Sequence, residues 1–334
     1  MQELYQELYQ GRPVERFVLT NHNHTRVVIL ALGGIIQEFS LIDHGQRQNL
    51  IVNFDKISDY IKNPYQICKQ IGRIAGRIKD ASFELSGQTV HVPANEGHNT
   101  LHGGDHGIAT KLFNGYQTAN NEVMLYLTLD TRQDHFPGSL TLMVDYLLTD
   151  DDKLTINYDV TAQKDTVFDP TVHIYWQLPQ NLKNTTLKIN GDQLQLTDKE
   201  KIPTGKLKNV KSSAFDFTTA RKLDEAVTML RSKNQQQGFD NGYAVHGSLT
   251  TPVAEIDKKN KHLKVKIFSD RNGLVIFTAD PQNSANDSKG IFNALATEVQ
   301  TLPDALHHPE FGEVRLLKGT HKHITMAFQV TKYQ

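Results

Sequence analysis

The chain has 334 residues, with 36 lysines and arginines against 37 aspartates and glutamates, which gives a formal net charge of −1. This balance, without a long run of like charge, argues against nucleic acid and an anionic membrane surface as partners. The single cysteine, Cys68, excludes an internal disulfide and a cysteine-built metal site, and it fits a cytoplasmic protein. The longest apolar run, residues 27–36, is far shorter than the roughly 20 residues of a membrane-spanning helix, and no secretory signal is visible.

Apolar and polar residues alternate along much of the chain with the period of a half-buried strand. In chain order, the clearest stretches are residues 123–129, 154–161, 263–267 and 324–330. Turn-forming sequences at residues 86–88, 190–192 and 271–273 separate the runs at spacings typical of antiparallel hairpins. Only one helical stripe is convincing, and it consists of Ala220, Leu223, Val227 and Leu230. The pattern predicts an all-β sandwich with few short helices.

Nothing in the composition divides the chain into separate units. It has no linker rich in proline or serine, no repeat of fixed period and no low-complexity tract. The sequence therefore predicts a single domain over residues 1–334. Monomer and dimer remain equally open.

Several common catalytic signatures are missing from the sequence. It has neither a glycine-rich phosphate loop nor the Gly-x-Ser-x-Gly elbow of many hydrolases. His102 and His106 have a spacing of four residues, but Gly103 and Gly104 lie between them and make a helical zinc site improbable. We therefore expect no metal.

Two glycine-containing segments combine polar groups in ways that a plain core does not require. In residues 71–78, an extended backbone would point Arg73, Ala75 and Arg77 to one face. Residues 95–104 form a polar loop whose final glycines would let backbone and ligand approach closely.

Two further segments present polar side chains with a period of two. In residues 170–178, His173 and Tyr175 share one face, whereas Trp176 lies on the other and is expected in the core. His173 would then be the exposed reagent. In residues 296–300, Glu298 and Gln300 face the same side.

Together with further short motifs, these segments resemble the hallmarks of the aldose 1-epimerase (galactose mutarotase) family. In chain order, the matching segments are residues 71–78, 99–104, 136–138, 203–205, 215–217, 238–240, and 298–300 with 303–305. The resemblance covers nearly the whole chain, and it implies a large antiparallel β supersandwich. It also implies interconversion of the α and β anomers of a free sugar.

The resemblance implies a role for five residues. Glu298 would be the general base on the C1 hydroxyl, and His173 would be the general acid on the ring oxygen. Arg77 and His102 would donate to sugar oxygens, and Asp240 would accept from ring hydroxyls. No cofactor and no metal would be needed. Arg73 belongs to the motif, but it is assigned no sugar contact.

Each of these residues also has a structural interpretation. His173 could be a hydrogen-bonded strand histidine, Glu298 a solvated carboxylate, Asp240 a turn residue and Arg77 an ion-pair partner. His102 could fix its loop instead of touching sugar. The motif context favours the functional roles.

The sequence departs from the family pattern at two positions. Gly76 and Val275 stand where many family members have asparagine and glutamine. Because both family residues are polar groups near the sugar, the departures bear on substrate specificity. The acid and the base are unaffected.

The preferred substrate remains open at this stage. Galactose, glucose and the reducing end of a disaccharide such as maltose or lactose all fit the chemistry. One alternative is a hexose-6-phosphate 1-epimerase, which would use Arg73 and Arg77 for the phosphate. The other alternative is a carbohydrate-binding protein without activity on the same fold.

Overall fold

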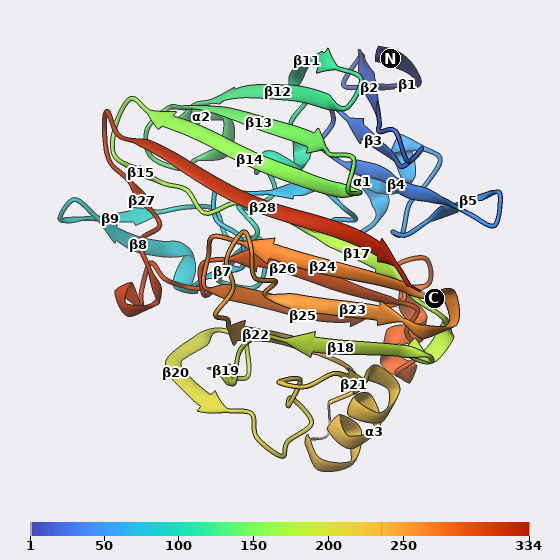
Figure 1. Cartoon of the computed structure of the whole chain (residues 1–334). Coiled ribbons are helices and arrows are strands. Elements are labelled where there is room, and N and C mark those ends of the chain that lie inside the picture. The colour runs from blue at the N-terminus through green and yellow to red at the C-terminus, as the bar shows by residue number, and fades with distance from the viewer. Residues whose placement is uncertain (1, 235, 334) are drawn as a thin grey trace.

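The computed structural model describes residues 2–234 and 236–333. Antiparallel sheets dominate these residues (Figure 1), which confirms the predicted all-β sandwich. No helix in the described part of the chain is long and apolar enough to cross a membrane.

The largest sheet, called here the β28 sheet, combines strands from the middle and the end of the chain. In spatial order, its strands are β11 (Asn114–Ala119), β12 (Glu122–Leu129), β13 (Leu140–Leu148), β14 (Lys153–Ala162), β28 (His321–Lys332), β24 (Leu263–Ser269), β23 (Ala254–Lys258), β18 (Thr185–Ile189) and β21 (Arg221–Lys222). Figure 1 shows β28 running through its middle, between β14 and β24. The C-terminal strand therefore joins two separate parts of the sheet.

A second sheet, called here the β26 sheet, packs near the β28 sheet. In spatial order, its strands are β17 (Ile174–Gln177), β26 (Ala294–Gln300), β25 (Gly273–Ala279), β22 (Asp240–Ala244), β19 (Gln193–Thr197) and β20 (Pro203–Asn209). All residues of β26 are buried, because neighbouring strands flank it and both of its faces are covered. One face packs into the core through Leu295 and Val299, and the other carries Glu298 and Gln300.

A third sheet lies at the N-terminal end. Its strands are β1 (Gln2–Tyr9), β2 (Arg12–Thr20), β3 (Arg26–Leu30), β4 (Ile36–Asp43) and β5 (Gln46–Asn49). Shorter strand pairs are β7 (Arg77–Ile78) with β10 (Thr100–Leu101), β6 (Gln70–Ile71) with β16 (Thr171–Val172), β15 (Thr166–Val167) with β27 (Arg315–Leu316), and β8 (Ser82–Leu85) with β9 (Gln88–His91).

Helices make up little of the described chain. They are α1 (Ile57–Lys62), α2 (Thr131–Asp134) and α3 (Leu223–Asn234), with the 3₁₀ turns η1 (Lys79–Ala81), η2 (Ile108–Thr110), η3 (Gln180–Leu182), η4 (Lys259–Lys261), η5 (Ser284–Lys289) and η6 (Pro309–Phe311). The predicted helical stripe is confirmed in α3, where Leu223, Val227 and Leu230 are buried, although Ala220 lies outside the helix and is exposed.

The predicted strands are confirmed where the alternation is strict. They correspond to β12, β14, β24 and β28. In β14, buried residues alternate with partly exposed ones, because one face of the strand packs on the core. Trp176 is fully buried, as predicted, and its ring lies near Phe39 of β4 and Phe328 of β28, with centroid separations of 6.3 and 5.6 Å. This residue therefore links the three main sheets.

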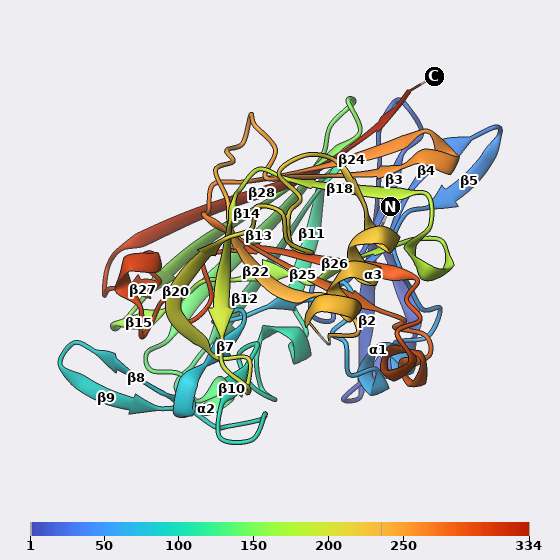
Figure 2. The ribbon, with the colours of Figure 1, turned by 90° about the horizontal axis from the view of Figure 1, so that it is seen from below.

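The hairpin prediction is correct for one of the three turn sequences. Residues 86–87 join β8 to β9, which pair with each other and project from the body in Figure 2. Residues 190–192 instead lead from the β28 sheet to the β26 sheet, and residues 271–273 make the same change of sheet. The hairpin interpretation of these two sequences is wrong, because turn residues bend the chain without choosing the partner strand.

Candidate active site

A pocket with a volume of about 190 Å³ opens beside β26. All five predicted site residues line it, namely Arg77, His102, His173, Asp240 and Glu298. They come from segments up to 221 positions apart in the sequence, so only the folded chain brings them together.

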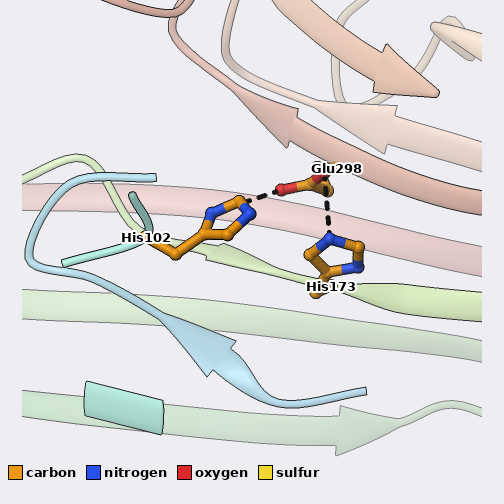
Figure 3. Close-up of side chains that lie close together, drawn as sticks. All are labelled: His102, His173 and Glu298. Atoms are coloured by element: carbon orange, nitrogen blue, oxygen red, sulfur yellow. Dashed lines mark ion pairs between the residues drawn. The ribbon is translucent and has the colours of Figure 1, made fainter. Parts of the chain in front are cut away.

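Glu298 and His173 form the centre of the pocket. Glu298 lies on β26, and His173 occupies the position between β16 and β17. Ile174 pairs with Thr297, so the two side chains project from neighbouring strands. His173 Nε2 lies 3.3 Å from Glu298 Oε1 (Figure 3). His173 is only 5% exposed, so the prediction of an exposed reagent is wrong, and the residue lies within the pocket wall.

Each member of this pair keeps one buried polar atom without a hydrogen-bond partner among the described residues. These atoms are Glu298 Oε2 and His173 Nδ1. Burying an unpaired polar atom costs free energy, so such atoms often mark a site that a ligand completes. The arrangement leaves the carboxyl free to exchange a proton with a bound hydroxyl.

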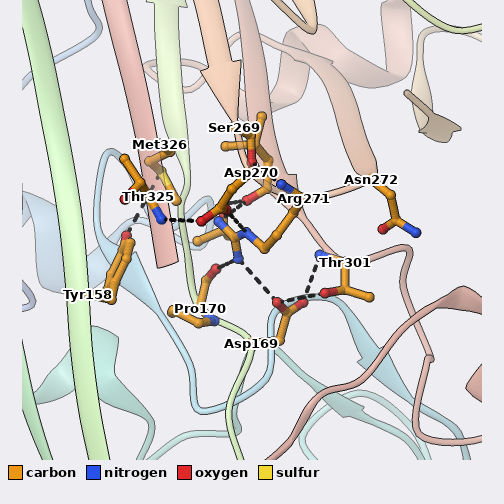
Figure 4. A network of polar contacts seen from close by, with 12 residues as sticks. Tyr158, Asp169, Pro170, Ser269, Asp270, Arg271, Asn272, Thr301, Thr325 and Met326 are labelled. Atoms are coloured by element: carbon orange, nitrogen blue, oxygen red, sulfur yellow. Dashed lines mark hydrogen bonds and ion pairs between the residues drawn. The ribbon is translucent and has the colours of Figure 1, made fainter. Parts of the chain in front are cut away.

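A polar network around Asp169 and Arg271 ties the segment before His173 to the end of β26 (Figure 4). The Asp169 carboxylate accepts hydrogen bonds from the N–H and the hydroxyl of Thr301, each at 3.0 Å, and from Arg271 at 3.2 Å. Arg271 also donates to the carbonyls of Pro170 and Val299. The segment that leads to His173 is thereby tied to the strand that carries Glu298.

His102 approaches Glu298 from the other side (Figure 3), with Nδ1 at 4.0 Å from Oε2. The N–H of Gly76 donates to this nitrogen at 3.2 Å, so the neutral ring carries its proton on Nε2. The two following glycines do not line the pocket. At Gly103 a Cβ would lie 2.0 Å from the carbonyl oxygen of Gly72, so this glycine allows the loop to pack closely. The prediction that it lets a ligand approach is wrong.

Arg77 and Asp240 both line the pocket that contains Glu298. Arg77 donates from Nε and Nη2 to the carboxylate of Glu96 at 2.6 and 2.8 Å, which fixes the guanidinium plane. Asp240 begins β22, and its carboxylate lies 3.7 Å from Lys201 Nζ. The two side chains place a fixed donor and an acceptor around the space in front of Glu298.

Arg73 lies outside the pocket, in agreement with its lack of an assigned sugar contact. The side chain is fully buried and donates two hydrogen bonds to Asp134, at 2.6 and 2.9 Å. The expectation that Arg73 and Arg77 share one face fails, because the segment is not one continuous strand and Gly76 has φ +76°.

Burial sets the protonation of the central groups. It raises the pKa of Glu298 to about 8; repulsion from Asp240 adds to this shift, and Arg77 partly offsets it. Burial lowers the pKa of His173 to about 4. The pKa of His102 is also well below its usual value, first through burial and then through repulsion from His173 and Arg77. At neutral pH the Glu298–His173 pair therefore carries one titratable proton, which lies on Glu298, while the His173 ring is neutral.

The same groups are close enough to hold a cation. Donor atoms of His102, His173 and Glu298 lie within 4.8 Å of one another. Two imidazoles and a carboxylate are ligands that zinc accepts. The same groups can also act without a metal, because Glu298 and His173 are close enough to exchange a proton with each other or with a bound sugar.

Several pocket residues had no predicted role. Tyr65, Tyr175 and Phe277 form an aromatic wall, with Tyr65 lying 6.4 and 6.0 Å from the other two ring centroids. Gln300, which shares the face of Glu298, is fully buried with both amide atoms unpaired among the described residues. The alternation of β26 indicated Gln300, whereas no pattern in the sequence indicated the wall as a unit. Lys201 lies at the rim.

The family model described as aldose 1-epimerase matches residues 15–329. The chain belongs to the aldose 1-epimerase family. A maltose epimerase from Levilactobacillus brevis is 39% identical over 325 residues, which cover 96% of this chain and 95% of the relative. An aldose 1-epimerase from Streptococcus thermophilus is 35% identical over 336 residues, which cover 95% of this chain and 94% of the relative.

Solved structures show the same fold as this aldose 1-epimerase. A galactose 1-epimerase from Lactobacillus acidophilus superposes with a TM-score of 0.85 at 21% identity, over 100% of this chain and 99% of the other. An aldose epimerase homologue from C. elegans gives a TM-score of 0.86 at 21% identity, over 96% and 99% of the two chains. The family match and the two curated relatives show that the protein is an isomerase that interconverts the anomers of an aldose.

Both departures from the family pattern lie in the pocket of this aldose 1-epimerase. Gly76 and Val275 line its wall, and Val275 pairs with Glu298 across β25 and β26. A Cβ at Gly76 would lie 3.3 Å from Pro303, and φ there favours glycine. The wall at these two positions therefore offers a sugar no side-chain hydrogen bond.

Proposed function

We propose that Glu298 is the general base and His173 the general acid of anomer interconversion. The observation that carries this proposal is the 3.3 Å contact between the two groups, whose remaining polar atoms have no hydrogen-bond partner among the described residues. Glu298 takes the proton of the C1 hydroxyl, and His173 delivers a proton to the ring oxygen. The ring C1–O bond breaks, and the open aldehyde forms.

The single proton of the pair explains how the cycle closes. Burial places this proton on Glu298, so it first shifts to His173 across the 3.3 Å contact and leaves Glu298 ionised. During ring opening, the proton on His173 then passes to the ring oxygen while Glu298 gains one from the C1 hydroxyl. Rotation about C1–C2 turns the other face of the aldehyde toward the C5 hydroxyl. Ring closure then returns a proton to His173 and takes one from Glu298. The pair carries one proton before and after each turnover, so no external acid or base is consumed.

Arg77, His102 and Asp240 orient the sugar. Arg77 is held by Glu96, which leaves its plane fixed and its remaining N–H groups available to sugar oxygens. His102 offers the N–H of Nε2, because Nδ1 accepts from the backbone of Gly76. Asp240 accepts from ring hydroxyls at the rim. Together they hold C1 and the ring oxygen at the pair.

The substrate is a free aldose: galactose, glucose or the reducing end of a disaccharide such as maltose. Similarity to a maltose epimerase over nearly the whole chain supports the disaccharide. A hexose 6-phosphate is the second candidate. Its phosphate would need unbalanced positive charge in the pocket, but Arg73 lies outside the pocket and pairs with Asp134, and the charge of Arg77 is balanced by Glu96. These pairings favour the neutral sugar.

The proposal is tested by the rate at which optical rotation reaches equilibrium. We expect the protein to accelerate mutarotation of freshly dissolved α-D-galactose, α-D-glucose or β-maltose at pH 7 in buffer containing EDTA. Galactose 6-phosphate and glucose 6-phosphate, each at ten times the concentration of the sugar, should leave this rate unchanged. Acceleration with a 6-phosphate alone would favour the phosphate branch, and no acceleration with any sugar would contradict the proposal.

The activity should depend on pH through the one-proton state of the pair. Below about pH 4, His173 gains a proton while Glu298 keeps its own, so the pair has no base. Above about pH 8, Glu298 loses its proton while His173 stays neutral, so the pair has no acid. We expect kcat/KM to be flat between these values and to fall on both sides, with each limb assigned to the pair as a unit. A profile that rises steadily through pH 8 would contradict the assignment.

We further propose that the chain works as one domain in the cytoplasm. Strand β28 joins both parts of the largest sheet, so residues from the middle and the end of the chain share a core. The one cysteine is buried and fits a reducing compartment.

A further inference from the structure

A second cleft adjoins the catalytic pocket. It has a volume of about 290 Å³, and the two cavities share Pro64 and Tyr65 as a common wall. The cleft lies between the end of α1 and residues 281–284, which follow β25. Its volume is close to the lower limit, about 300 Å³, of sites that bind small molecules. The cleft is therefore large enough for one small group of a ligand.

The walls of this Tyr65 cleft have the chemistry of a sugar site. The rings of Phe54 and Tyr65 offer apolar faces for the C–H groups of a pyranose. Asp59 offers an acceptor, Lys62 offers donors, and Gln282 offers both. One carboxylate and one ammonium balance in charge, so the cleft suits a neutral polyhydroxyl group and not a phosphate.

Hydrogen bonds between distant segments hold the cleft in shape. The Asn63 side chain donates to the carbonyl of Pro281 at 2.8 Å, and its oxygen accepts from the N–H of Tyr65 at 3.0 Å. The Tyr65 hydroxyl donates to Asp287 at 2.5 Å. A site whose walls are already fixed loses less entropy when a ligand binds.

Aromatic contacts connect this cleft to the reacting pair. The ring of His173 stacks on Tyr175 with a centroid separation of 4.9 Å, and Tyr175 lies 6.4 Å from Tyr65. Tyr65 therefore stands between the reacting sugar and the cleft. A second sugar unit that extends past Tyr65 from a ring held at Glu298 would reach the cleft, because Pro64 and Tyr65 line both cavities.

We propose that the Tyr65 cleft binds the second sugar unit of a disaccharide whose reducing end reacts at Glu298 and His173. The inference rests on the proposed function, because the cleft has this use only if the pocket epimerises reducing sugars. It adds a binding site for the unit that does not react. The unit gains contacts in the cleft, and these contacts favour maltose over glucose.

Mutarotation of maltose and of glucose by one set of variants tests the site. Gln282 is exposed in the cleft, so Gln282→Trp should fill the space without disturbing the core. We expect kcat/KM for maltose to fall about tenfold or more, the scale of one or two lost contacts, while the value for glucose stays within about twofold. Lys62→Ala, which removes a donor without adding bulk, should lower maltose turnover alone by a smaller factor.

Gln88→Trp is the matched control, because Gln88 is an exposed glutamine in the β8–β9 hairpin, outside both cavities. It should leave both sugars unaffected. Equal losses for maltose and glucose, or no loss for either, would overturn the cleft assignment while leaving the proposed function intact. A loss for maltose confined to Lys201→Ala would put the second unit beside Lys201, which is outside the cleft, and overturn the assignment too. A wild-type protein inert toward maltose, glucose and galactose would overturn the proposed function itself.

Discussion

Replacement of Glu298 by glutamine should lower kcat for mutarotation by about 10³-fold, within the range that general acid–base catalysis supplies. Glutamine has nearly the same shape, but its amide cannot take a proton from the C1 hydroxyl. Rates of optical rotation change, corrected for the spontaneous reaction, measure the loss. Sugar affinity, measured by titration calorimetry, should change little, because Arg77, His102 and Asp240 keep their positions. Turnover within tenfold of the wild type would show that Glu298 is not the base.

The partner residue provides the control for this result. His173→Gln should lower kcat by a similar factor, because ring opening then lacks the acid. Since the two residues act as one proton-carrying pair, the double variant Glu298→Gln/His173→Gln should be hardly slower than either single variant. Losses that multiply in the double variant would mean that the two groups act independently.

Loss of Arg73 should produce the largest fall in stability, because its partner then remains buried and charged. The side chains of Arg73 and Asp134 are 0% and 1% exposed. Arg73 also donates hydrogen bonds to the carbonyls of Pro137 and Gly138 and to the hydroxyl of Thr166. We expect Arg73→Met to lower the free energy of unfolding by about 3–5 kcal/mol. Urea unfolding followed by the fluorescence of Trp176, the one tryptophan of the chain, measures this change.

Two further variants test whether the loss of stability comes from burial of the Arg73–Asp134 pair or from the removal of any charge. Arg73→Met/Asp134→Leu removes both charges and should recover much of the lost stability. Lys222→Met breaks the exposed pair with Glu225, in which both side chains are 61% exposed, and should cost less than about 1 kcal/mol. If Arg73→Met cost no more than Lys222→Met, the buried pair would have no special part in stability.

Local patterns in the sequence determined the strands and much of the active site. Apolar alternation marked β14 and β28, because one face of each strand packs on the core and the other does not. The same period placed Glu298 and Gln300 on one face of β26. Short motifs, taken together, indicated the family and so the five residues that line the pocket. These features depend on neighbours along the chain or on a motif, and both are readable from sequence.

Only the tertiary structure decided which neighbours each residue meets. Arg73 and Arg77 are four positions apart, yet one is buried against Asp134 and the other lines the pocket beside Glu96. The chain bends at residues 190–192 and 271–273, but the strand that follows each bend joins another sheet. His173 is buried because β26, Tyr175 and the loop of His102 surround it, and the shifts in the pKa values of His173 and Glu298 follow from that burial. Burial and pairing arise between distant segments, and periodicity along one strand carries no information about them.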